Sequence, residues 1–210
     1  MIKIMVFNVT MIMTNCYLLT DEKSGKMAVV DPGGKSDKLI SKINKSGGKL
    51  EYVILTHGHY DHIGYSKQLA DMFGAKVICP RKTQSFLNDN VLNHSAFHPD
   101  FEEIKPYKAD VLLDDGDTFT LGETEIKFIE TPGHTEDSGC YLFDNILISG
   151  DTLFCESYGR TDLPTGNDEQ MIDSIKRLKN LDGNPDVLPG HGMLSNLEHE
   201  RKFNPLMRRL

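Results

Sequence analysis

Short apolar segments separated by turn residues fill the first eighty residues of the chain. Segments of this kind predict strands at residues 2–9, 15–20, 27–30, 52–55 and 75–79. Between them, apolar residues at helical spacing, followed by glycine, predict two helices within residues 35–50 and 66–74. The first half of the chain therefore alternates between strands and helices.

The second half is richer in strands. Residues 81–108 break the alternation and predict an irregular segment with prolines and two isolated histidines. Five strands are then predicted at residues 111–113, 117–121, 124–130, 139–143 and 145–149. A helix over 167–181, a strand over 186–190 and a short helix near 196–203 complete the chain. Because both halves run from strands to a helix, a strand and a histidine-bearing loop, the order predicts an α/β (α+β) fold with two β-rich layers enclosed by helices.

Length and composition favour one globular domain over residues 1–210. Hydrophobic residues make up 39% of the chain, enough for a substantial core, and no linker or close repeat divides it. The net charge of −8 argues against broad nucleic-acid binding, which needs a basic surface. No segment reaches the roughly 18 apolar residues of a membrane helix. The four cysteines are scattered, which favours reduced thiols, so we expect a cytoplasmic protein that binds neither nucleic acid nor membranes.

The segment ILTHGHYDHIG, residues 54–64, has the highest density of metal-capable side chains in the sequence. Those side chains are His57, His59, Asp61 and His62. They follow a predicted buried strand, and the glycine at position 58 lets the backbone bend sharply. Imidazoles crowded in this way repel one another when protonated and are poorly solvated when buried, whereas a divalent metal uses them as ligands. The segment therefore predicts a metal site.

Three further loops repeat one design, a strand followed by glycine and then by histidine or aspartate. FIETPGHTEDS contains His134, ILISGDTLF contains Asp151, and DVLPGHGM contains His191. One such loop is common by chance, but three of the same design indicate ligands that converge on one edge of a sheet.

Four other candidate residues are predicted not to bind metal. Isolated histidines are more often ordinary core or surface residues, and this interpretation applies to His94, His98 and His199. Cys155 follows Asp151 closely, but no histidine stands beside it in the sequence to act as a base, so it is not predicted to be a nucleophile.

The motifs T-H-x-H-x-D-H, P-G-H-T, G-D-T and P-G-H-G, in this order, resemble the metallo-β-lactamase superfamily over nearly the whole chain. The resemblance implies a four-layer αββα sandwich with its metals at one edge between the sheets. It implies two sets of ligands, His57, His59 and His134 for one metal and Asp61, His62 and His191 for the second, with Asp151 bridging them. Two divalent ions are expected, with zinc favoured and iron or manganese as alternatives.

The segments GDTLF, GRTDLPTG and HERKFNP resemble short members of the glyoxalase II group, which hydrolyse S-acylglutathione thioesters. The chain stops soon after His191, so we expect the short form without the helical extension that helps longer members bind glutathione. The resemblance implies hydrolysis by a hydroxide that bridges the metals, because bound divalent ions lower the pKa of water from 15.7 to about 7. The implied catalytic residues are His57, His59, Asp61 and Asp151. The implied partner is a small anionic thioester.

Arg160 and Tyr158 are predicted to contact the substrate, because in glutathione-hydrolysing relatives a basic residue near Arg160 contacts the glutathione backbone. An ion pair between Arg160 and Asp162 is an equally good interpretation of the same residue.

Other activities share the motifs. They are hydrolysis of a lactone or another ester, oxidation of a glutathione persulfide by a single iron ion, and, as a non-enzymatic alternative, electron transfer as in flavodiiron proteins. Flavodiiron proteins usually have a glutamate where His59 stands, which argues against the last alternative.

Overall fold

Two six-stranded sheets form the centre of the molecule. The computed structural model describes residues 1–101 and 103–210. The first sheet has the order β1 (Ile2–Val9), β2 (Thr14–Asp21), β3 (Lys26–Val30), β4 (Lys49–Ile54), β5 (Lys76–Pro80) and β6 (Val111–Leu113). The second has the order β14 (Ser195–Asn196), β13 (Asp186–Pro189), β10 (Ile146–Gly150), β9 (Gly139–Phe143), β8 (Thr124–Glu130) and β7 (Thr118–Leu121). A small hairpin of β11 (Leu153–Phe154) and β12 (Ser157–Tyr158) follows β10.

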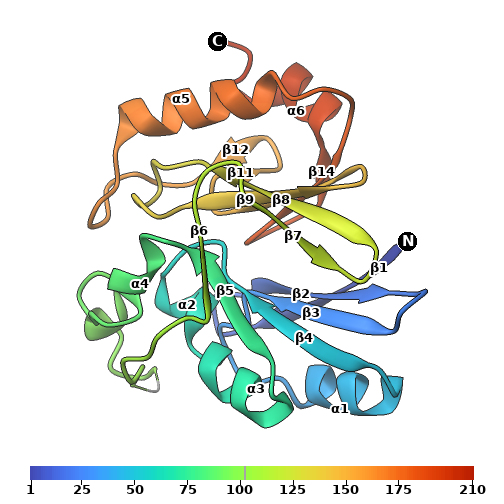
Figure 1. Cartoon of the computed structure of the whole chain (residues 1–210). Coiled ribbons are helices and arrows are strands. Elements are labelled where there is room, and N and C mark those ends of the chain that lie inside the picture. Colours follow the sequence, from blue (N-terminus) through green and yellow to red (C-terminus); the bar gives the residue numbers. More distant parts are fainter. Residues whose placement is uncertain (102) are drawn as a thin grey trace.

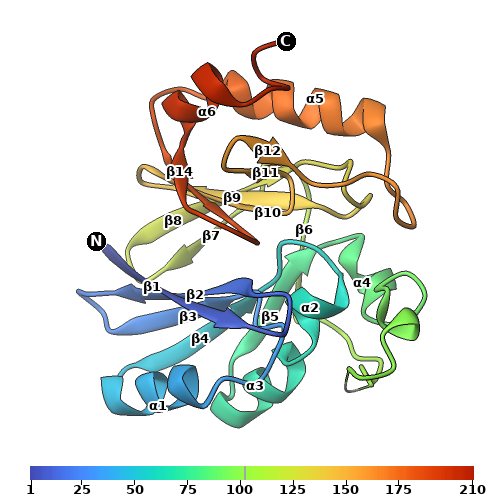
Figure 2. The same cartoon turned by 180° about the vertical axis from the view of Figure 1, so that it is seen from behind.

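Helices cover the outer face of each sheet. Figure 1 shows α1 (Asp37–Ser46) and α3 (Ser66–Phe73) below the first sheet, and α5 (Asp168–Lys179) and α6 (Leu197–Phe203) above the second. The view from behind shows the same four layers (Figure 2). The predicted αββα sandwich is therefore confirmed. Among the described residues, no helix is long and apolar enough to cross a membrane.

The ends of the longer helices follow from local chemistry. The side chain of Ser36 accepts a hydrogen bond from the backbone N–H of Leu39 at the start of α1, and Gly47 ends this helix in a left-handed conformation. At the start of α5, the side chain of Asn167 accepts from the N–H of Gln170. Acidic residues occupy the first turn of α5 and basic residues its last turn, which complements the helix dipole.

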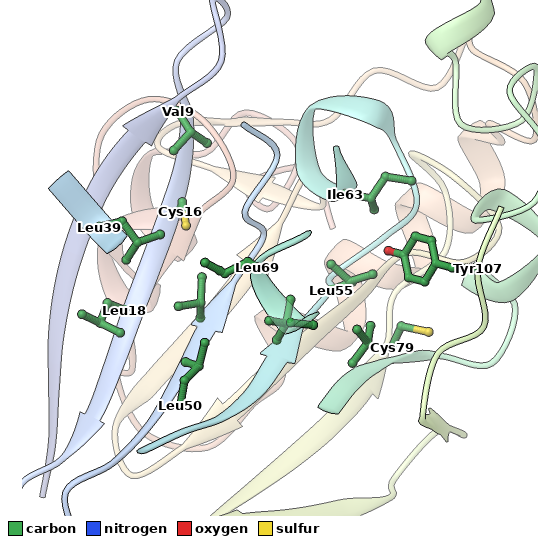
Figure 3. Close-up of a cluster of buried hydrophobic side chains, with 14 of the residues drawn as sticks. Val9, Cys16, Leu18, Leu39, Leu50, Leu55, Ile63, Leu69, Cys79 and Tyr107 are labelled. Atoms are coloured by element: carbon green, nitrogen blue, oxygen red, sulfur yellow. The ribbon is translucent and has the colours of Figure 1, made fainter. Parts of the chain in front are cut away.

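Three apolar layers hold the sandwich together, and β2 shows how one strand serves two of them. Its residues Cys16 and Leu18 face α1 and α3, whereas Tyr17 and Leu19 face the second sheet. This alternation follows from the two-residue period of a strand. Figure 3 shows the layer beneath the first sheet, a buried cluster that includes Leu69 of α3 together with Leu18 and Leu50 of the sheet.

Several short elements were not predicted from the sequence. The metal-capable segment contains the one-turn helix α2 (Tyr60–Ile63), and the segment predicted to be irregular contains α4 (Thr83–Phe86) and a 3₁₀ turn at Ser95–Phe97. Strands β11, β12 and β14 were also missed. Elements of two to four residues are too short to show a period, so only their tertiary contacts define them. That residues 1–210 form one domain stays a prediction.

The Leu69→Ala variant should lose about 2–5 kcal/mol of unfolding free energy, because it leaves a cavity in a fully buried layer. Met72, on the same helix, is 52% exposed, so Met72→Ala serves as the control and should stay within about 0.5 kcal/mol of the wild type. Urea denaturation measures both. Equal losses in the two variants would contradict the packing described here.

Candidate metal centre

The ends of strands that run in the same direction bring the predicted residues together. In the first sheet, β3 and β4 are parallel neighbours, and the loops that follow them carry Asp31 and His57. In the second sheet, β10 is parallel to β13, and β9 lies antiparallel between β8 and β10, so β8, β10 and β13 share one direction. The loops after these strands carry His134, Asp151 and His191. Because strands of one direction end at the same edge of a sheet, both sheets deliver these side chains to one edge of the sandwich.

Close backbone packing orients the segment between β4 and α3. Gly58 lies against Phe86 of α4, where a Cβ atom would be only 2.2 Å from the Cβ of Phe86. Gly33 lies against α2, where a Cβ atom would be 1.4 Å from the carbonyl oxygen of Asp61. Glycine is therefore required at both positions by lack of space. The α2 turn, held in this way, carries Asp61 and His62 into the interior.

Six of the seven predicted ligands have a polar atom 2.9 to 3.6 Å from a polar atom of another member of the set. The Nε2 atom of His62 is 3.2 Å from an oxygen of Asp61 and 3.4 Å from an oxygen of Asp151. The Nε2 atom of His191 is 3.2 Å from Asp61 and 3.6 Å from Asp151. The Nε2 atom of His134 is 3.6 Å from Asp151 and 2.9 Å from Nδ1 of His59. His57 lies behind this group, with its ring 4.2 Å from that of His62 between centroids.

The polar atoms of these side chains are better suited to binding a metal ion than to hydrogen bonding with one another. Buried atoms without a hydrogen-bond partner among the described residues include Nε2 of His57, His59 and His62 and Oδ1 of Asp151. Buried polar atoms nearly always have a hydrogen-bond partner, so several such atoms without one in the same place indicate a binding site for an ion. Three overlapping sets have ligand atoms within 4.8 Å of one another: His57, His59 and His134; His57, His62 and Asp151; and Asp61, His62 and His191. The cluster is therefore suited to divalent metal binding.

Burial and neighbouring charges set the protonation of the cluster. Burial lowers the pKa of His57 and His59 well below the usual histidine value, and neighbouring imidazoles lower it further. Both rings are thus neutral, as a metal ligand must be. Burial alone would raise the pKa of Asp61, but His62 and His191 outweigh it and hold this pKa well below its usual value. Burial alone would lower the pKa of His62, but nearby carboxylates raise it well above the usual value. The carboxylates therefore create a negative field that favours a cation.

A layer of hydrogen bonds behind the cluster orients its rings. Asp31 accepts from Nδ1 of His62 at 2.9 Å, and it is itself held by the N–H and hydroxyl of Thr56 at 2.8 and 2.7 Å. The carbonyl oxygen of Arg160 accepts from Nδ1 of His134 at 2.7 Å. These contacts direct Nε2 of both rings into the site.

Sequence reasoning missed Asp31 and Thr56. A related signal was present for Asp31, because in MAVVDPGG an aspartate directly follows a buried strand, although the glycines come after it and not before it. For Thr56 the sequence had no signal beyond its position next to His57.

A cavity of about 480 Å³ opens onto the cluster. Among its lining residues are His59, Asp61, His134, Asp151, His191, Ile12, Phe154 and Arg160. Arg160 makes a two-pronged ion pair with Asp162, at 2.6 and 2.7 Å, and both side chains are exposed. Arg160 therefore forms the predicted ion pair with Asp162 and also lies at the rim of the cavity, and its contact with the substrate stays a prediction.

Tyr158 is not among the described residues that line this cavity. It pairs directly with Leu153 across the β11–β12 hairpin, so the two side chains share one face of the hairpin. Phe154 follows Leu153 and therefore points to the other face, where it lines the cavity. Strand alternation thus places Tyr158 on the hairpin face opposite Phe154, and its contact with the substrate stays a prediction.

The residues predicted not to bind metal lie outside the three ligand sets. His94 and His98 line the cavity, and the ring of His94 is 6.1 Å from that of His59 between centroids. His199 forms a 3.0 Å contact with Glu156, and these two residues and Cys155 also have potential ligand atoms within 4.8 Å of one another. The sequence had not indicated this last grouping, because it joins a hairpin turn to α6.

An αββα sandwich with histidine and aspartate ligands at one edge defines a class of metal-dependent hydrolases. The family model described as "Metallo-beta-lactamase superfamily" matches residues 9–191, and the chain belongs to this superfamily.

Individual proteins of known sequence or structure resemble the chain over most of its length. It is 31% identical over 204 residues to hydroxyacylglutathione hydrolase GloC of Haemophilus influenzae, covering 95% of each chain. It is 31% identical over 188 residues to a Bacillus subtilis protein named "Probable polyketide biosynthesis zinc-dependent hydrolase PksB", covering 89% of this chain and 76% of that one. The crystal structure of BLEG-1 B3 metallo-beta-lactamase superimposes with a TM-score of 0.90 at 32% identity, covering 98% and 99% of the two chains.

The Asp151→Ala variant should bind metal at least about tenfold more weakly, because Asp151 is the carboxylate that approaches His62, His134 and His191 together. Elemental analysis after dialysis measures the metal content, and circular dichroism checks that the fold is retained. The double variant His94→Ala/His98→Ala is the control and should keep the wild-type stoichiometry. An unchanged metal content in Asp151→Ala, or the loss of one ion in the control, would contradict the ligand set.

Proposed function

We propose that the protein is a hydrolase that uses two divalent metal ions, with zinc favoured, to cleave a thioester such as an S-acylglutathione. The observation that carries this proposal is the group of buried, unpartnered imidazole and carboxylate atoms at the end of an open cavity. The names of two relatives, a hydroxyacylglutathione hydrolase and a zinc-dependent hydrolase, support the reaction and the metal.

In this proposal each ion has three ligands of its own, and one carboxylate is shared. His57, His59 and His134 would hold the first ion, and Asp61, His62 and His191 would hold the second. Asp151 would be the shared ligand, and its distances of 3.4 to 3.6 Å to three of these histidines support that role. Catalysis is attributed to His57, His59, Asp61 and Asp151 through the ions that they hold.

Two such ions would supply hydroxide at neutral pH, because a bound divalent ion lowers the pKa of water to about 7. The protein's own residues provide orientation. Asp31 fixes the ring of His62, and the carbonyl of Arg160 fixes the ring of His134. Thr14 donates a 2.8 Å hydrogen bond to Asp61 and so directs its carboxylate. No serine or cysteine nucleophile is needed.

Recognition of the substrate would depend on residues at the rim of the cavity. Arg160 carries the positive charge there, and a guanidinium binds a carboxylate or an amide oxygen through two parallel hydrogen bonds. We therefore propose that it contacts the anionic thiol portion of the substrate. We also propose a cytoplasmic location, because none of the four cysteines is in a disulfide.

Purified protein loaded with zinc should hydrolyse S-lactoylglutathione, lose this activity when a chelator removes the metal, and regain it when zinc is restored. A lactone tests the nearest alternative, and oxygen uptake with glutathione persulfide tests the dioxygenase alternative. Metal content should be near two ions per chain. Oxygen uptake without thioester hydrolysis, or faster cleavage of the lactone than of the thioester, would contradict the proposal.

The Arg160→Ala variant should raise KM for the anionic thioester about tenfold or more, because a charged hydrogen bond contributes about 1.5–3 kcal/mol. KM for a small neutral ester should change little. Asp162→Ala is the matched control, since it breaks the same ion pair but keeps the guanidinium. If both variants lose thermal stability and both substrates are affected equally, Arg160 has a structural role and does not anchor the substrate.

A further inference from the structure

A second cavity, of about 360 Å³, adjoins the cavity that opens onto the metal centre, which we call the main cavity. The two share the lining residues Ile12, Tyr60 and His98. The other walls of this second cavity, which we call the side groove, come from two segments far apart in the sequence. One is the tip of the β1–β2 hairpin with Met11, and the other is the segment Phe97–Phe101.

The side groove is mainly apolar. Met11 and Phe97 are 89% and 58% exposed, an unusual degree of exposure for large apolar side chains beside a cavity. The charged residue in its lining is Asp100, which would repel an anion. Arg160, in contrast, lines the main cavity and is not among the described residues of the side groove. An anionic portion of a ligand is therefore favoured at the Arg160 rim of the main cavity, and an uncharged apolar portion in the side groove.

Specific contacts hold both walls in place. At the hairpin tip, Thr10 and Met13 have left-handed backbone angles, with φ of 61° and 60°, and such angles are disfavoured for a β-branched residue such as threonine. The tip is tied to the metal centre, because Nδ1 of His191 contacts the carbonyl oxygen of Ile12 at 3.3 Å.

The opposite wall is a packed aromatic group. Tyr60 stacks on His98 with ring centroids 4.3 Å apart and meets Phe101 edge to face at 4.8 Å. The ring of Phe101 also packs so closely on Gly64 that a Cβ atom there would lie 2.4 Å from it. A groove held by these contacts has a defined shape before any ligand binds.

We propose that the side groove binds the acyl chain of the substrate, so that the preferred thioesters carry an extended apolar acyl group. This proposal rests on the thioesterase function proposed above. The reacting carbonyl would lie at the metal centre in the main cavity, beside the residues that the two cavities share. The thiol portion of the substrate would extend past Arg160, and the acyl chain would pass Ile12 and Tyr60 toward Phe97.

The test uses the zinc-loaded protein and glutathione thioesters of acetyl, butyryl, hexanoyl and octanoyl groups. The value of kcat/KM should rise with chain length by up to about fourfold per methylene, which corresponds to about 0.8 kcal/mol per buried CH₂. Met11→Ser and Phe97→Ala should each reduce this rise. Met72→Ser is the matched control, because Met72 is also an exposed methionine but lies on α3, outside both cavities, and it should keep the wild-type dependence.

The rates separate a failure of the acyl groove from a failure of the thioesterase function. If the acetyl thioester is cleaved and longer chains give no increase, the acyl groove is wrong and the thioesterase function stands. If rates follow the apolar character of the thiol and not that of the acyl group, the groove binds the leaving group and this proposal is overturned.

If no thioester is cleaved, the proposed function fails, and binding alone tests the groove. Calorimetry should then show tighter binding of octanoate than of acetate to the zinc-loaded protein, and Phe97→Ala should remove the difference. Equal binding of the two acids would overturn the proposal.

Discussion

The rest of this structure depends on one constraint, which is that many charged and imidazole side chains are buried close together. Seven metal-capable side chains share one edge of the sandwich, and several of their polar atoms have no hydrogen-bond partner among the described residues. Left without a cation, such atoms would cost free energy, since each loses water and gains nothing in return. The ligand loops nevertheless stay together, because the surrounding apolar layers and glycine contacts leave them little freedom to move apart.

The two sheets contribute to the site in the same way. Strands β3 and β4 in one sheet, and β8, β10 and β13 in the other, end at the shared edge, and each is followed by a loop with a carboxylate or imidazole. Short loops on rigid strands position ligands more precisely than long loops do. The direction of these strands therefore explains why residues as far apart in the chain as Asp31 and His191 belong to one site.

The surroundings of the metal centre differ in chemistry from one side to the other. Arg160 brings a positive charge to the main cavity, whereas the side groove is apolar and carries the carboxylate of Asp100. Both walls of the side groove are tied to predicted ligands, because Ile12 on the hairpin contacts His191 and Tyr60 on α2 lies between His59 and Asp61 in the chain. The proposed substrate selection and the proposed metal binding thus depend on the same few segments of the chain.

The sequence by itself determined the layer order and nearly all of the longer elements, because apolar periods of two and 3.6 residues extend over enough positions to be read. It also indicated His57 and its neighbours, because metal-capable side chains are crowded there, and His134, Asp151 and His191, because each follows a strand and a glycine. Only the tertiary structure decided what surrounds them. The hydrogen bond from His62 to Asp31 and the side groove between Met11 and Phe97 join segments distant in sequence, whereas the orientation of Tyr158 depends on the β11–β12 hairpin. Such contacts leave no local period, since they depend on how the strands and loops pack in three dimensions.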